Sequence, residues 1–141
     1  MALIKPLTYM RTQLDSLGYS EWSDGFNFEN IPSSIIDGAY HLEVGIISSQ
    51  SANQRAHQFS FPVVLRVFLK GFSDPKSAID DALLRGDNIL GAVLSEANRL
   101  TQAEDIKDVV PNSITVQELS ASNDNSVILQ MEFVFNIYQC F

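Results

Sequence analysis

Adjacent carboxylates and a carboxylate–lysine pair come nearest to a catalytic arrangement in this sequence. Asp80 and Asp81 are neighbours, while Asp105 and Lys107 have the D-x-K spacing seen in some metal-dependent nucleases. Hydrolysis of phosphodiesters at such sites needs carboxylates that converge on a divalent cation. Asp80 and Asp81 fall in a predicted helix, where neighbouring side chains point about 100° apart. Asp105 lies in a predicted connection without an upstream Pro-Asp partner, so we expect neither a metal site nor a cofactor.

The histidines and the single cysteine form no pattern typical of nucleophilic catalysis. Such catalysis requires a serine or cysteine beside a basic side chain. The two histidines, His41 and His57, are expected on a strand and beside a polar loop, far in sequence from Cys140. The chain also contains neither G-x-G nor G-K-[ST], the motifs of phosphate-binding loops. We interpret both histidines as ordinary polar residues and expect no enzymatic activity.

The composition predicts an acidic, folded protein of one domain spanning residues 1–141. There are 17 Asp and Glu residues against 9 Lys and Arg, which gives a net charge of −8. Tight binding to phosphate backbones depends on clustered Lys and Arg, so this balance argues against a protein that grips DNA. One cysteine allows no disulfide within the chain, and no apolar run approaches the ~20 residues needed to cross a bilayer. We therefore expect an intracellular product with no membrane partner.

Two long amphipathic strands dominate the sequence. Side chains alternate between the two faces of a strand, and this alternation gives Gln58–Lys70 and Val127–Gln139 one apolar face and one mixed face each. The apolar faces comprise Phe59, Phe61, Val63, Leu65, Val67 and Leu69 in the first strand, and Val127, Leu129, Met131, Phe133, Phe135 and Ile137 in the second. Pro62 cannot donate a ladder hydrogen bond, so we expect the first strand to begin at a sheet edge or beyond its neighbours.

Helices and shorter strands complete the predicted domain. In chain order we expect a helix over Lys5–Leu17, a strand over Ala39–Ile47, a polar loop over Ser48–Ala56, the first long strand, a helix over Pro75–Asn98, a short strand over Ile114–Leu119 and the second long strand. This order predicts an α+β domain: one four-stranded, mostly antiparallel sheet with both helices on its apolar face. A right-handed crossover would allow one central pairing to be parallel, making the sheet mixed.

Two other features have alternative interpretations. The irregular segment Tyr19–Gly38 contains Trp22, Phe26 and Phe28, which would either plug the end of the core or form an arm that contacts a partner. Gly86 and Gly91 lie inside the longer predicted helix, where glycine is unfavourable. Close packing on the sheet would explain them, and a kink near Gly86 is the alternative.

The mixed faces of the two long strands form the candidate interaction surface. A freely solvated sheet face is usually more polar, whereas subunit interfaces surround apolar anchors with polar groups. The alternative is an ordinary sheet surface, or one covered by residues 19–38. The candidate contact residues, drawn from these faces and the adjoining loops, are Gln54, Arg55, His57, Arg66, Phe68, Lys70, Asn123, Asp124, Glu132 and Tyr138.

The size and order of elements resemble the tail terminator proteins of long-tailed, non-contractile phages (siphophages), similar to the minor tail protein that caps lambdoid tails. The resemblance covers nearly the whole chain. It consists of the helix at Lys5–Leu17, the strand pair over Tyr40–Lys70, the Gly-Phe-Ser-Asp-Pro transition into the helix at Pro75–Asn98, and the hairpin over Ile114–Gln139. It is architectural and carries over no functional residue.

This resemblance implies a non-enzymatic virion protein at the head-proximal end of the tail, made in the host cytoplasm. Such a protein forms a ring, typically a hexamer, on the tail tube, stops tube polymerisation and provides the head-joining surface. The implied partners are further copies of the chain, the tail tube protein and a head-completion or connector protein. DNA would pass through the ring without specific binding. The alternatives are another neck component, such as a head-completion or connector protein, and a small metal-dependent nuclease.

Overall fold

The computed structural model describes residues 2–22, 38–51, 56–69, 74–102, 106–118 and 126–140, and within them forms an α+β domain. Its elements are a short 3-10 helix η1 (Ala2–Ile4), α1 (Lys5–Ser16), β1 (Ser20–Glu21), β2 (Ala39–Val44), β3 (Ser48–Ser51), β4 (Ala56–Leu69), α2 (Pro75–Val93), α3 (Glu96–Gln102), β5 (Ile106–Glu118) and β6 (Val127–Cys140). The α+β class is confirmed. The prediction of four strands is wrong, because the sheet has six.

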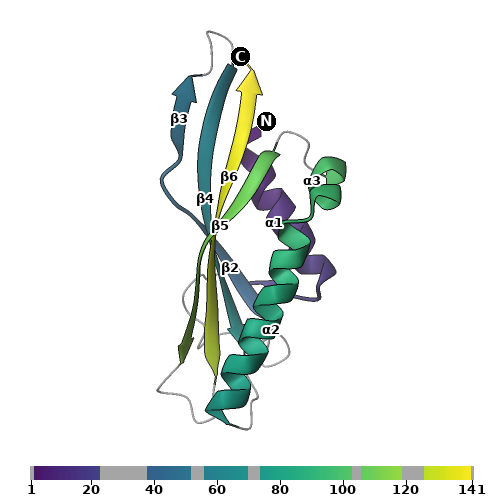
Figure 1. The fold of residues 1–141 in the computed structure, drawn as a ribbon, viewed down its shortest axis with the longest axis vertical. Coiled ribbons are helices and arrows are strands. Elements are labelled where there is room, and N and C mark those ends of the chain that lie inside the picture. Colours follow the sequence, from purple (N-terminus) through teal and green to yellow (C-terminus); the bar gives the residue numbers. More distant parts are fainter. Residues whose placement is uncertain are drawn as a thin grey trace.

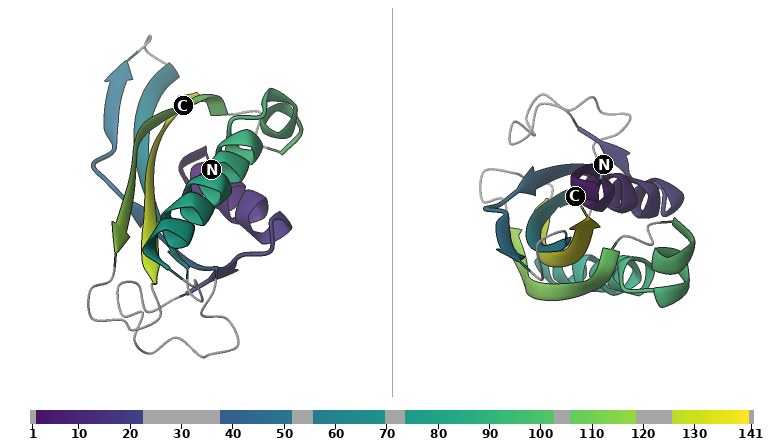
Figure 2. Two further views of the ribbon diagram at one scale, coloured as in Figure 1. Left: turned by 60° about the horizontal axis from the view of Figure 1, so that its bottom comes forward. Right: turned by 90° about the horizontal axis from the view of Figure 1, so that it is seen from above.

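The sheet is built around β4 and β6, which are 14 residues long each and pair antiparallel along their whole length. The strand order is β1-β2-β4-β6-β5, with β3 also paired to β4. The central pairing is therefore antiparallel, and the parallel pairing is β1 with β2 at the edge. All three α-helices lie on one face of this sheet (Figure 1, Figure 2).

The core lies between the sheet and the helices, as the alternation of β4 and β6 predicts. All six apolar-face residues of β6 are at most 1% exposed, and the β4 residues from Phe61 to Leu69 on the same face are similarly buried. Helix α2 buries Ala78, Ala82, Ile89 and Val93 against them. Leu83 and Leu94 are 52% and 40% exposed. The helix turns its small residues toward the sheet, and this lets it approach closely.

The two additional strands explain the error in the strand count. β1 is only two residues long, and β3 lies in the segment predicted to be a polar loop. The Ser-Ser-Gln-Ser sequence of β3 has no apolar alternation that would predict a strand. It is held by backbone pairing to the first half of β4, from Ser48 opposite Ser60 to Ser51 opposite His57.

A break at residues 45–47 separates β2 from β3, and Pro62 of β4 lies opposite it. Pro62 accepts a hydrogen bond from the Gly45 amide at 2.9 Å. Because the N and C=O of one residue point to the same side of an antiparallel strand, the missing N–H of Pro62 also faces the break. The β4–β6 ladder is left intact. The start of β4 is paired with β3 on one side and with β6 on the other. The expectation that this strand begins at a sheet edge or beyond its neighbours is therefore wrong.

Strand β5 is 13 residues long, more than twice the length predicted. Its register against β6 shifts between Ile106 and Asp108 and again between Pro111 and Ser113. Each bulge adds one residue and reverses the alternation of faces. The first half of β5 therefore lacks the continuous period-two pattern that predicts a strand.

The long helix predicted over Pro75–Asn98 is two helices, with a break at residues 94–95. Asp74 caps α2 by accepting from the Ser77 amide at 2.8 Å. At the break, the Tyr9 hydroxyl donates to the Val93 carbonyl at 2.8 Å, and the Ser95 hydroxyl accepts from the Asn98 amide at 3.3 Å. Both contacts satisfy backbone groups that a continuous helix would have bonded internally.

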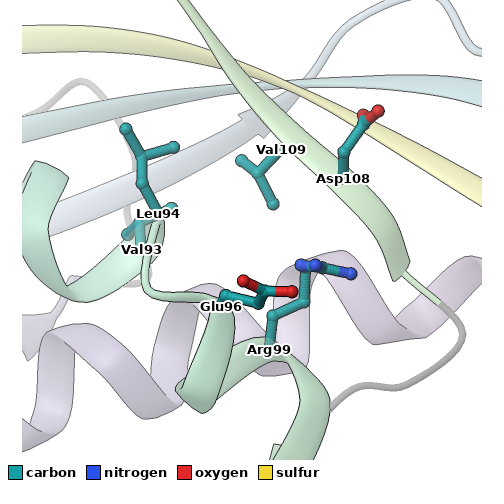
Figure 3. A pocket seen from close by; sticks show the side chains of 6 residues that line it. All are labelled: Val93, Leu94, Glu96, Arg99, Asp108 and Val109. Carbon is teal, nitrogen blue, oxygen red and sulfur yellow. The ribbon is translucent and has the colours of Figure 1, made fainter.

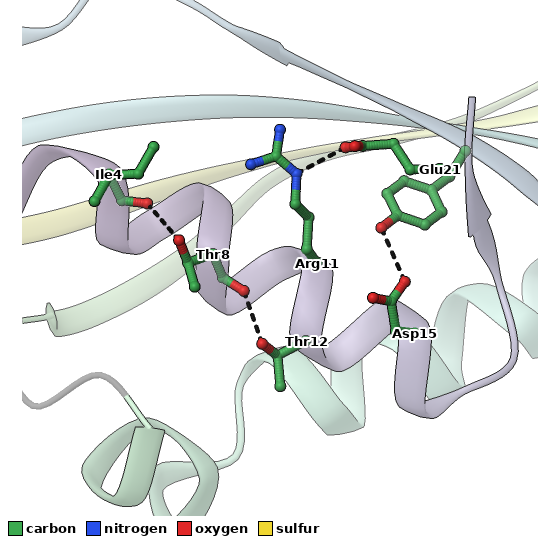
Figure 4. A network of polar contacts seen from close by, with 7 residues as sticks. Ile4, Thr8, Arg11, Thr12, Asp15 and Glu21 are labelled. Carbon is green, nitrogen blue, oxygen red and sulfur yellow. Dashed lines mark hydrogen bonds and ion pairs between the residues drawn. The ribbon is translucent and has the colours of Figure 1, made fainter. Parts of the chain in front are cut away.

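Helix α1 ends at Ser16 in a Schellman motif, in which Gly18 follows the C-cap residue Leu17. Gly18 has φ of 92°, its amide donates to Asp15, and the Tyr19 amide donates to Leu14. Polar contacts then join α1 to the edge of the sheet (Figure 4): Arg11 pairs with Glu21 at 2.8 Å, and the Tyr40 hydroxyl donates to the Asp15 carboxylate at 3.2 Å. Residues 23–37 of the Tyr19–Gly38 segment and residues 119–125 before β6 lie outside the described residues.

Burial of two tyrosines predicts a loss of stability at alkaline pH. Burial raises the pKa of Tyr9, and burial together with the Asp15 and Glu21 charges raises the pKa of Tyr40. Below about pH 10 the phenols are neutral in both the folded and the unfolded chain, so they do not lower the free energy of unfolding. Above it only the unfolded phenols ionise, and each costs about 1.4 kcal/mol per pH unit up to its folded pKa.

We expect Tyr40→Phe to flatten the fall in unfolding free energy between pH 10 and 11.5 and Tyr9→Phe combined with Tyr40→Phe to flatten it further. Urea titrations at each pH measure the slope, and titrations at pH 8 correct for the lost hydrogen bonds. An alkaline slope equal to that of the wild type in the double variant would contradict this assignment.

Two glycines should respond to alanine in opposite directions. Gly86 lies within the uninterrupted helix α2, and a Cβ there would sit 3.7 Å from the Leu129 side chain, an ordinary contact. Gly86→Ala should therefore raise the unfolding free energy by about 1 kcal/mol. A Cβ at Gly45 would lie 2.9 Å from Cγ of Pro62. Gly45→Ala should lower the unfolding free energy by about 1–3 kcal/mol; thermal denaturation of both variants tests the pair.

Candidate functional site

The sheet face that points away from the helices is the candidate site, and we call it the open face. Helices α1, α2 and α3 all lie on the opposite side (Figure 2). The open face comprises Gln58, Ser60, Pro62, Val64, Arg66 and Phe68 of β4 and Ile128, Gln130, Glu132, Val134, Asn136 and Tyr138 of β6. All are half-buried except Phe68, which is 6% exposed.

A charged cluster lies in the middle of the open face. Arg66 pairs with Glu43 of β2 at 2.7 Å and donates to the Gln130 side chain of β6 at 3.1 Å. Its side chain is 19% exposed, whereas that of Glu43 is 46% exposed. Arg66 therefore ties three neighbouring strands together.

An apolar band crosses the open face next to this cluster. The register places Pro62 opposite Val134, and Val134 opposite Val110 of β5. Val64 lies one step along β4. Val110 is 49% exposed, so the band opens to solvent toward the β5 edge.

The end of the open face formed by the start of β4 and the end of β6 is polar. The Tyr138 hydroxyl donates to the Gln58 side chain at 3.0 Å, and the Asn136 amide donates to the Asp108 carboxylate. The Lys107 ammonium lies 4.8 Å from the centre of the Tyr138 ring, a cation–π contact. These contacts use up much of the hydrogen-bonding capacity of this end within the chain.

The structure brings together four of the ten predicted contact residues. Arg66, Phe68, Glu132 and Tyr138 share the open face. His57 pairs with Gln139 and so points to the other face, where its ring centre is 6.4 Å from that of Phe59. The remaining five, Gln54, Arg55, Lys70, Asn123 and Asp124, lie outside the described residues. Sequence reasoning missed Glu43 and Val110, because only the strand order brings them to this surface.

Asp105 lies outside the described residues, and the described residues considered for catalysis do not converge. Asp81 pairs with Arg85 at 2.8 Å one helical turn away, while Asp80 is exposed. His41 lies across from Arg66 on the neighbouring strand. Within the described ranges, no three His, Cys, Asp or Glu side chains gather as metal ligands.

A surface pocket of about 320 Å³ lies between α3 and β5 (Figure 3). It is lined by Val93, Leu94, Glu96, Arg99, Asp108 and Val109. Arg99 donates to the carbonyls of Ile106 and Lys107 at 2.8 and 2.6 Å, so it anchors α3 to the start of β5. With Asp108 bonded to Asn136, the described residues that line the pocket include no paired nucleophile and base.

No helix in the described ranges is long and apolar enough to span a membrane. Comparison of the sequence with models of known protein families yields no match, and comparison with curated proteins likewise yields none.

Exchanging the charges of the Arg66–Glu43 pair tests how much this pair contributes to the stability of the domain. Arg66→Glu places two carboxylates together and should lower the unfolding free energy by about 1 kcal/mol. Adding Glu43→Arg should restore most of that loss, since the opposite charges again face each other. Urea denaturation of both variants measures the difference, and a double variant no more stable than Arg66→Glu would show that the pair contributes no net attraction.

Proposed function

We propose that this protein is a structural tail terminator, which forms a ring on the end of a phage tail tube. The ring stops tube polymerisation and presents a surface for joining the head. The proposal combines the architectural resemblance in size and element order with the surface of the folded domain. In it, the protein has no catalytic role and acts by contact alone.

The open face is the observation that supports this proposal most strongly. Its half-buried apolar band of Pro62, Val64 and Val134 lies between a charged cluster and a polar end. Apolar anchors with a polar surround are typical of protein–protein interfaces. A contact with the tube protein or with another copy would exclude water from the band.

The arrangement of charged residues also favours a structural role. Arg66 pairs with Glu43, Arg11 with Glu21, and Arg85 with Asp81, so these cations serve contacts within the domain. The net charge of −8 would give a ring an acidic surface. Repulsion between such a surface and phosphates would let DNA pass through the channel without being held.

The open face can be tested by placing a cation on its apolar band. Val134→Arg should raise the Kd for purified tail tubes, measured by cosedimentation, at least tenfold, a loss of about 1.4 kcal/mol or more in binding free energy. The stem of the new arginine would lie along the sheet and its guanidinium would reach water, so the fold should survive. Circular dichroism and thermal denaturation check the fold.

The matched control is Leu84→Arg, the same change at a 60% exposed position of α2 on the helical side of the domain. This variant should cosediment as the wild type does. Wild-type protein that neither binds tubes nor oligomerises in their presence would refute the proposed function. If a folded Val134→Arg variant binds tubes as tightly as the wild type, the open face is not the surface that binds them.

A further inference from the structure

We propose that copies of this chain contact each other head to tail through the two opposite edges of the sheet. The β2–β3 edge, residues 44–51, would meet the β5 edge, residues 109–117, of the next copy. This inference rests on the proposed function, because it assigns the contact that would close the ring.

The β2–β3 edge exposes apolar side chains at the break opposite Pro62. Ile46 is 89% exposed, and Val44 and Ile47 are each 39% exposed. Ile46 and Ile47 lie in the break, because the pairing to β4 stops at Val44 and resumes at Ser48. Beyond it, β3 pairs with β4 and has no second strand partner within the described ranges.

The β5 edge also exposes apolar side chains, with Val110 on the open face and Pro111 and Ile114 on the helix side. Val110 is 49% exposed, Ile114 is 42% exposed, and Pro111 between them is exposed as well. Strand β5 pairs with β6 and has no other strand beside it in the part of the chain that the structure describes. Its two bulges distort the ladder around these residues.

Both edges lack charged residues, and this points to another copy as the occupant. No Asp, Glu, Lys or Arg occurs in residues 44–51 or in residues 109–117. Two copies with a net charge of −8 repel each other, so a contact that contains no acidic side chains avoids adding local repulsion. Isolated sheet edges usually carry charges that prevent such association. Neither edge carries one, and each offers apolar side chains that suit the other.

The positions of the edges determine the kind of assembly. β4 and β6 separate them, so the two surfaces lie on opposite sides of the sheet. A contact between two different surfaces leaves each copy with one free edge of each kind. Such head-to-tail contacts continue until the rotation closes a ring.

Substitution of one edge at a time tests this inference. Ile46→Asp and Ile114→Asp should each raise the protein concentration for half-maximal ring formation on tail tubes about tenfold or more, measured by sedimentation velocity and negative-stain microscopy. The aspartate is exposed at both positions, so folding should be unaffected. Leu84→Asp, on the outer side of α2, is the matched control and should form rings normally.

Mixing the two variants distinguishes head-to-tail contact from the alternatives. Each variant retains one intact edge, so an equimolar mixture at high concentration should form pairs that neither variant forms alone, and no rings. Normal rings from either variant alone, or loss of assembly from only one of them, would refute the inference while leaving the proposed function intact. A wild-type chain that forms no ring even on tubes would refute both.

Discussion

The antiparallel pairing of β4 with β6 is the constraint on which the rest of the structure depends. The two strands pair over 14 residues each, and their register shows no shift. That continuity keeps every apolar side chain on one face, so the helices have a single surface to cover. It also collects Arg66, Gln130 and Val134 on the other face, which becomes an organised surface as a consequence of the same ladder.

Pro62 modifies this ladder in a way that shapes the edge of the sheet. Because its missing N–H faces away from β6, the central pairing survives while the neighbouring strand breaks into β2 and β3. Gly45 supplies the close approach that the ring of Pro62 requires. The break then exposes Ile46 at a position where a continuous strand would hold it in the ladder. Pro62 therefore leaves the central β4–β6 pairing intact, while the strand beside it is interrupted and exposes apolar side chains.

The parts of the fold with a regular period were predictable from the sequence. Alternation in β4 and β6 located the core, and the Gly-Phe-Ser-Asp-Pro transition located the start of α2 at Pro75. Bulges in β5 reversed the alternation, and β3 depends on backbone pairing rather than on its own side chains, so both escaped notice. The open face was foreseen on β4 and β6 alone. The contributions of Glu43 and Val110 depend on strand order, which pairings between distant segments decide.

The most direct measurement is the length of tail tubes polymerised from purified tube protein in the presence of increasing amounts of this chain. A ring that caps the tube predicts that mean tube length, measured by electron microscopy, falls as the ratio of this protein to tube protein rises. The same images should show extra ring density at one end only. Tubes of unchanged length without terminal density, at concentrations where the chain remains folded, would contradict a terminator function.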